Sequence, residues 1–149
     1  KNITTILEAL ADFGLNEKDL TTLTEAVRTA ISRQICEPYL LPGRTLAVFT
    51  FDPALENAIS SQLRDAGGNA YLALDADDVQ GVMESIGRAI EQAAPLETEP
   101  ILLSSAQLRP HIKRLTEPYL PNLVVLSYNE IPAGIEIRRL ATVEMNTPG

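Results

Sequence analysis

The first 41 residues carry apolar side chains at the spacing of an α-helix. A first helix is predicted over residues 3 to 13 by an apolar face made of Ile3, Ile6, Leu7 and Leu10. After Gly14, Asn16 is suited to cap a second helix, which Pro38 would end. The stripe of this second helix, with spacings of three and four, consists of Leu20, Leu23, Val27, Ala30, Ile31, Gln34 and Ile35, all apolar except Gln34. Two helices cannot bury such a stripe alone, so we predict a helical subdomain over residues 1–41 that packs on the rest of this chain, on an upstream part of the protein or on another subunit.

Beyond residue 42, short apolar runs alternate with helical patterns. Five strands are predicted, at residues 45–51, 70–74, 101–105, 122–127 and 135–144, the last at an edge of the sheet. Helices are predicted from Asp52-Pro53 to a stop at Gly67 and Gly68, then over 75–94 and over 106–119. In the last of these, Pro110 indicates a loose first turn or a late start. Parallel strands need crossovers of this length, so we predict an α/β subdomain over 42–149 with a mostly parallel sheet of four to five strands.

Composition narrows the class of protein. A chain of 149 residues suits one domain, or one domain with a small appendage, and is long enough for a real core without disulfides. The only cysteine, Cys36, is expected to be a buried apolar residue. The net charge of −8 is concentrated in residues 42–99, which makes nucleic acid a poor partner. No apolar run approaches the length of a membrane span.

The predicted strands end in polar side chains, at the edge where parallel sheets usually bind ligands. The strand ends carry Asp52, the group Asp75, Asp77 and Asp78, the pair Ser104 and Ser105, and the tetrad Ser127 to Glu130. The acidic group could hold Mg²⁺, which would make this a nucleotide- or Mg-responsive α/β domain. It also falls at a helix start, where carboxylates cap free N–H groups. Capping is the interpretation we favour, and the magnesium-responsive domain is the alternative.

Nucleophilic catalysis has weak support. Ser104 or Ser105 would need a nearby base, and the only histidine, His111, lies in the third predicted helix with no orienting partner evident. We expect His111 to be a structural residue, at the surface or half-buried. The sequence contains neither of two glycine-rich nucleotide-binding motifs, G-x-x-x-x-G-K-[ST] and G-x-G-x-x-G after a strand. We therefore expect no catalytic residues, no cofactor-binding residues and no metal ligands.

Two polar segments are candidates for a structural role or for contact with a partner. In Ser127, Tyr128, Asn129 and Glu130, side-chain hydrogen bonds would fix the turn that leaves the fourth strand. A joint of this kind is favoured over a contact with a partner, and both over a reaction centre. The other segment includes Glu117 and Pro118, in a sequence EPYL that also occurs at residues 37–40. Both copies are expected to connect a helix to a strand.

Several stretches together resemble one family. They are TTILEALADF, LTEAVRTAISRQIC, FTFDPALE and above all ILLSSAQLRPHIKRLTEPYLPNLVVLSYNEI followed by ATVE. The chain is similar to the flagella/HR/invasion proteins export pore family, the large export-gate component of type III secretion systems. The resemblance covers nearly all of the sequence. The long motif that ends in LSYNEI carries most of its specificity.

The resemblance implies a place and a role. In that family the N-terminal half spans the bacterial inner membrane and the C-terminal half forms a cytoplasmic ring of nine copies. This chain resembles the last two subdomains, so we expect a non-catalytic region that receives export substrates, their chaperones and the ATPase stalk. Contact between copies in the ring is expected through the helical stripe, with Leu20, Leu23, Val27 and Ile31 as candidates. The stretches YLALDADDVQ and FTFDP favour a virulence injectisome over a flagellum.

The sequence opens inside an apolar-periodic pattern and without an initiator Met, so we expect it to be a piece of a longer protein. Membrane spans upstream in the full gene would support the export gate.

Overall fold

The computed structural model describes residues 17–145. The predicted helix over residues 3 to 13 and the cap at Asn16 lie outside them. The second predicted helix is present as two pieces, α2 (Glu17–Ala30) and α3 (Ser32–Cys36), followed by the 3-10 turn η1 (Glu37–Tyr39). Hydrogen bonds from Ile31 N to Val27 O (3.0 Å) and from Ile35 N to Ile31 O (3.1 Å) continue across the break at Ile31.

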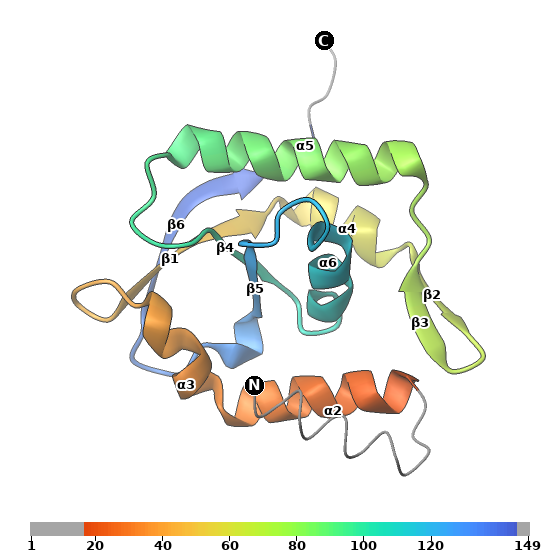
Figure 1. Cartoon of the computed structure of the whole chain (residues 1–149), viewed down its shortest axis with the longest axis horizontal. Coiled ribbons are helices and arrows are strands. Elements are labelled where there is room, and N and C mark those ends of the chain that lie inside the picture. Colours follow the sequence, from red (N-terminus) through yellow and green to blue (C-terminus); the bar gives the residue numbers. More distant parts are fainter. Residues whose placement is uncertain (1–16, 146–149) are drawn as a thin grey trace.

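A four-stranded sheet forms the centre of the molecule (Figure 1). Its strands are β1 (Thr45–Phe51), β4 (Ile101–Ser104), β5 (Val124–Ser127) and β6 (Glu136–Val143), in the order β5-β4-β1-β6. All three neighbouring pairs are parallel, which confirms the predicted α/β class and the predicted edge position of the last strand.

One predicted segment is wrong. The helix after β1, α4 (Pro53–Ser60), ends before Leu63, and the chain then forms a hairpin of β2 (Leu63–Ala66) and β3 (Asn69–Leu72) outside the main sheet. Gly67 and Gly68, with φ of 61° and 89°, form the hairpin turn and do not stop a helix. Glycine at positive φ suits a helix end and a tight hairpin turn equally well, so the two glycines alone could not separate the alternatives.

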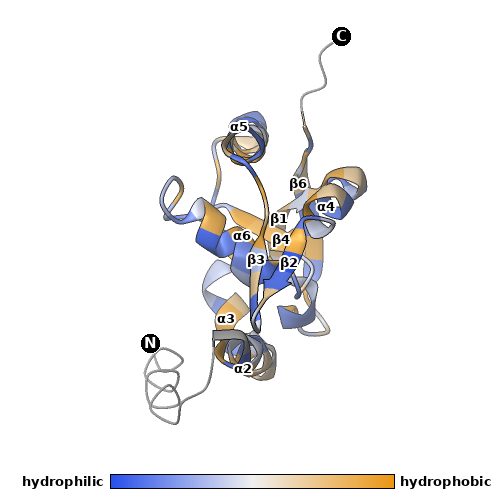
Figure 2. Cartoon of the chain, turned by 90° about the vertical axis from the view of Figure 1, so that its right-hand side faces the viewer, coloured by the Kyte–Doolittle hydropathy of each residue, from blue (hydrophilic) through white to orange (hydrophobic). Residues whose placement is uncertain are grey.

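Helices cover one face of the sheet, and the α3 segment covers the other. On the first face α4, α5 (Ala76–Ala93) and α6 (Arg109–Thr116) pack over a core that includes Phe49, Leu102, Val125, Ile86 and Ile112. The late start at Pro110 is confirmed, because α6 begins at Arg109. In Figure 2 the most hydrophobic colours gather in the strands between these layers.

The second face shares its core with α3. Leu46, Val48, Ile101, Leu103 and Leu126 of the sheet form one cluster with Cys36, which is fully buried as predicted. Ile35, Tyr39 and Leu40 pack against the same cluster, and so do Ile131 and Ile135 of the connection between β5 and β6. The end of the predicted helical subdomain therefore rests directly on the sheet.

Candidate functional site

The polar tetrad at the end of β5 contains one fully buried carboxylate. Tyr128 to Glu130 form the 3-10 turn η2 (Tyr128–Glu130), and the Glu130 side chain folds back so that Oε1 accepts a hydrogen bond from Ser127 N at 2.8 Å. Glu130 has 0% exposure and Ser127 has 1%. The Cys36 thiol donates to the carbonyl oxygen of Glu130 at 3.2 Å. Glu130 thus fixes the turn that leaves β5 and contacts α3 as well.

Two arginines and a second glutamate complete the surroundings of Glu130. Arg28 Nε of α2 lies 2.8 Å from Glu130 Oε2, although its N–H is not aligned for a hydrogen bond with that oxygen. Arg109 Nε of α6 lies 3.9 Å from Glu130 Oε1 and donates to both carboxylate oxygens of Glu25, each at 3.1 Å. We call Glu25, Arg28, Arg109 and Glu130 the Glu130 cluster. It joins α2, α6 and η2.

Burial sets the electrostatics of this cluster. Removal from water raises the pKa of the Glu25 carboxyl, and this effect outweighs the attraction of Arg109. Removal from water also lowers the pKa of Arg109, and the nearby positive charge of Arg28 adds to that shift. The pKa of the Cys36 thiol is raised by burial and then by the negative charge of Glu130. Removing one charge from such a buried group would leave its partner uncompensated, so the charges of the cluster depend on one another.

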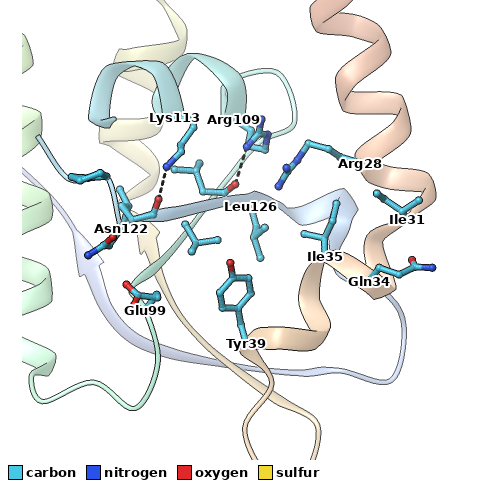
Figure 3. A pocket seen from close by; sticks show the side chains of 14 residues that line it. Arg28, Ile31, Gln34, Ile35, Tyr39, Glu99, Arg109, Lys113, Asn122 and Leu126 are labelled. Atoms are coloured by element: carbon cyan, nitrogen blue, oxygen red, sulfur yellow. Dashed lines mark hydrogen bonds between the residues drawn. The ribbon is translucent and has the colours of Figure 1, made fainter. Parts of the chain in front are cut away.

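The same helix α6 also closes the outer edge of β5. Lys113 Nζ donates to Leu123 O at 2.9 Å, and Arg109 Nη1 donates to Val125 O at 3.0 Å (Figure 3). With the bond from Ser127 N to Glu130, three backbone groups that point away from β4 have side-chain partners. An unpaired strand edge is a template for pairing with other chains, and side chains that occupy its polar groups prevent this.

Beside this edge lies a cavity of about 810 Å³. Arg28, Ile31 and Tyr39 line it on the side of the α2–α3 segment, and residues 123–126 line it on the side of β5 (Figure 3). A second cavity of about 460 Å³ is lined by Thr21 and Thr24 of α2 and by Arg109 and Lys113 of α6. The contact between α2 and the rest of the protein is therefore flanked by open space.

The remaining tetrad and connector candidates are at the surface. Tyr128 is 49% exposed and Asn129 is exposed, so only Ser127 and Glu130 of the tetrad are buried. Glu117 is exposed and pairs with Lys113 at 2.8 Å. Pro118 is exposed as well. These positions are available to a partner.

The stripe residues proposed for assembly are intermediate in burial. Leu20, Leu23, Val27 and Ile31 are each neither buried nor fully exposed. Their contact with another copy stays a prediction.

The acidic side chains at the strand ends lie at the starts of the helices that follow. Asp75 Oδ1 accepts from Asp78 N at 2.8 Å and caps α5, as the favoured interpretation predicts. Asp52 precedes α4 but makes no capping hydrogen bond with its side chain. Across residues 17–145, no group of three or more His, Cys, Asp or Glu side chains is placed to hold a metal ion. The arrangement gives the magnesium-responsive alternative no support.

Of the serine and histidine candidates, Ser104 and His111 are buried and Ser105 is partly buried. Ser104 Oγ donates to Ser105 O at 3.0 Å, and Ser105 N donates to Glu56 Oε2 at 2.9 Å. His111 is 7% exposed within α6, so it is more buried than the surface or half-buried position expected for it.

Sequence reasoning missed three of the four members of the Glu130 cluster. Glu25 and Arg28 interrupt the apolar stripe of α2 three residues apart, which places both on one side of the helix. That spacing was the available signal. For Arg109 the only hint was its place next to Pro110 at a helix start.

Comparison with known proteins decides the family. A model described as the FHIPEP family matches residues 1–136. The chain belongs to this family. It is 34% identical over 97% of its length to the flagellar biosynthesis protein FlhA of Bacillus subtilis, of which it covers 21%. It is 32% identical over 96% of its length to the low calcium response locus protein D of Yersinia pestis, of which it covers 20%. The chain thus spans about a fifth of the length of these relatives.

Solved structures agree with this assignment. The CdsV protein of Chlamydia pneumoniae matches with a TM-score of 0.77 and 31% identity over 97% of this chain and 41% of that one. The nonameric cytosolic domain of EscV from a type III secretion system matches with a TM-score of 0.67 and 28% identity, over 95% of this chain and 41% of that one. The matched structures therefore include the nonameric cytosolic domain of a type III secretion system protein. No helix within residues 17–145 is long and apolar enough to span a membrane.

Proposed function

We propose that this region is the C-terminal cytoplasmic part of a type III secretion export gate, in a protein anchored in the inner membrane by segments outside it. It acts as a ring subunit that docks export substrates, their chaperones and the ATPase stalk, and it performs no catalysis itself. The observation that carries the proposal is the likeness of 97% of the chain to CdsV, with a TM-score of 0.77. CdsV has also been solved in complex with CdsO, which supports docking of a further secretion component.

Ring formation is proposed to use the apolar stripe of α2. Its side chains are only half-buried in the described residues, and the nonameric EscV ring supports a similar assembly here. Within the longer protein, the membrane part would concentrate the copies, and such tethering raises their effective concentration. The isolated chain should therefore be monomeric or only weakly associating.

The test is the mass of a longer version of the protein that includes upstream sequence. Light scattering should show rings for the parent and loss of rings for Val27→Glu, after circular dichroism has shown that the variant is folded. Thr22→Glu, at an exposed position of the same helix, is the matched control and should keep the rings. Rings that persist in folded Val27→Glu would remove the stripe from the assembly surface.

Docking of partners is tested separately, by titrating the ring with its own system's stalk protein and with a chaperone–substrate complex. Binding to the ring, with weakened binding for variants at exposed Tyr128, Asn129, Glu117 or Pro118, would support a contact role for these candidates. Binding that is the same for all four variants would leave them without that role.

We favour an injectisome over a flagellum for the system it serves. Injectisome proteins such as CdsV and EscV support this choice, while FlhA shows that flagellar relatives are as similar in sequence. Complementation of a strain that lacks its injectisome gate, compared with one that lacks FlhA, would decide between them.

A further inference from the structure

Helix α2 is attached to the sheet differently from every other described helix. None of the described side chains of α2 is fully buried, and neither apolar core contains a residue from it. By contrast, α3 contributes Cys36 to the core of the second face, while α4, α5 and α6 each contribute buried apolar residues to the first. Among the described residues, α2 thus contributes no fully buried apolar side chain to the core, and its Leu20, Leu23 and Val27 are only partly buried.

Charged groups supply the contact that the apolar core does not. Arg28 of α2 lies against Glu130 Oε2 at 2.8 Å, and Glu25 of α2 pairs with Arg109 Nε at 3.1 Å. The side chains on the α2 side are 20% and 17% exposed, whereas Glu130 and Arg109 are almost completely buried at 1% and 9%. Each pair thus joins one partly exposed group on α2 to one buried group on the α/β unit.

The surroundings of these ion pairs favour a movement of α2 as one piece away from the α/β unit. Cavities of about 810 and 460 Å³ flank the contact between α2 and α6, so the helix is not closely packed on these two sides. The helix is interrupted at Ile31, between α2 and α3, where the bonds from Ile31 N to Val27 O and from Ile35 N to Ile31 O remain, and α3 is anchored by Cys36. A short break between a loosely packed helix and an anchored one is a natural hinge.

We propose that α2 opens and closes on the α/β unit as a separate element about a hinge at Ile31, and that the Glu130 cluster is the contact that keeps it closed. Opening would join the two cavities and expose Glu130, Arg109 and the side chains that close the edge of β5. Segments with few buried apolar contacts are those that open locally while the core stays folded. This inference holds for a single chain and does not depend on ring formation.

Hydrogen exchange at several urea concentrations tests it on the chain as it stands. In the parent, amides of α2 should exchange faster than those of β4 and with a weaker dependence on urea, because local opening exposes less surface than unfolding of the sheet. Arg28→Gln should accelerate exchange in α2 about tenfold, the usual scale for losing a hydrogen-bonded or paired charge, and its weak urea dependence should remain.

Two further variants make the result decisive. Arg138→Gln removes an exposed ion pair with Glu97 at the opposite edge of the sheet and should leave α2 unchanged. Glu130→Gln keeps an acceptor for Ser127 N but removes the charge, so it should act like Arg28→Gln, and the double variant should add little to either single one. If Glu130→Gln fails to fold, Arg28→Gln and Arg138→Gln alone decide.

Three results would overturn the proposal. In the first, α2 and β4 of the parent share one exchange rate and one urea dependence, which would make α2 part of a single cooperative unit. In the second, Arg28→Gln leaves α2 as protected as in the parent. In the third, the effects of Arg28→Gln and Glu130→Gln are fully additive, which would mean that the two residues act independently.

Discussion

Ser127 and Glu130 are joined by a hydrogen bond in which the Ser127 amide donates to the buried Glu130 carboxylate at 2.8 Å. Glu130→Ala would remove this acceptor and leave Arg28 and Arg109 without their shared anion. Breaking a buried pair on one side costs about 3 kcal/mol, so we expect a loss of about that much free energy of unfolding, measured by urea denaturation. Asn129→Ala is the control: Asn129 is exposed, and its change should stay within about 0.5 kcal/mol. Similar losses of free energy of unfolding for both variants would mean that stability depends on the turn as a whole and not on the Glu130 carboxylate.

The turn between β2 and β3 should be sensitive to substitution of Gly67. Gly67 has a φ of 61°, so Gly67→Ala places a side chain in a strained conformation and should lower the free energy of unfolding by about 1 kcal/mol.

Gly87 lies inside α5 with open space where a Cβ would stand. Gly87→Ala should raise the free energy of unfolding by about 0.5–1 kcal/mol, because alanine favours the helix. Thermal unfolding of both variants gives the signs, and a stabilising Gly67→Ala would contradict the turn.

The pKa of Glu25 predicts a pH dependence. Because burial raises this pKa above its ordinary value of 4.5, the folded protein binds the proton more tightly than the unfolded chain. The stability contributed by Glu25 is therefore fully present below about pH 4.5 and is lost as the pH rises through the folded pKa. The free energy of unfolding of the parent, minus that of Glu25→Gln, should fall as the pH is raised from 4 to 7. A difference that rises with pH would show that the attraction of Arg109 outweighs burial.

Cys36 should be protected from thiol reagents in the folded protein. It is fully buried, it donates to Glu130 O at 3.2 Å, and burial raises the pKa of its thiol, so little thiolate is present at pH 8. Labelling with a thiol reagent should be slow without urea and should accelerate as urea unfolds the core around α3. Labelling in buffer as fast as in the unfolded chain would place Cys36 outside that core.

The sequence predicted those parts of the fold that leave a local pattern. Alternation of apolar runs with helical stripes predicted the parallel sheet, and the capping carboxylate of Asp75 marked the start of α5. The last strand was predicted at an edge, and β6 lies there with its first four residues exposed. Such features follow from neighbouring residues, because the period of side chains along a helix or strand is fixed by the backbone.

What the tertiary structure decided lies between residues far apart in sequence. Gly67 and Gly68 could end a helix or turn a hairpin, and only the pairing of Leu63–Ala66 with Asn69–Leu72 selected the hairpin. The sequence also indicated that Ser127 to Glu130 form a joint, but it could not name the partners. Glu25 and Arg109 are 84 positions apart, and Cys36 and Glu130 are 94 apart. Contacts at such separations leave no periodic signal, because folding alone brings these groups together and removes them from water.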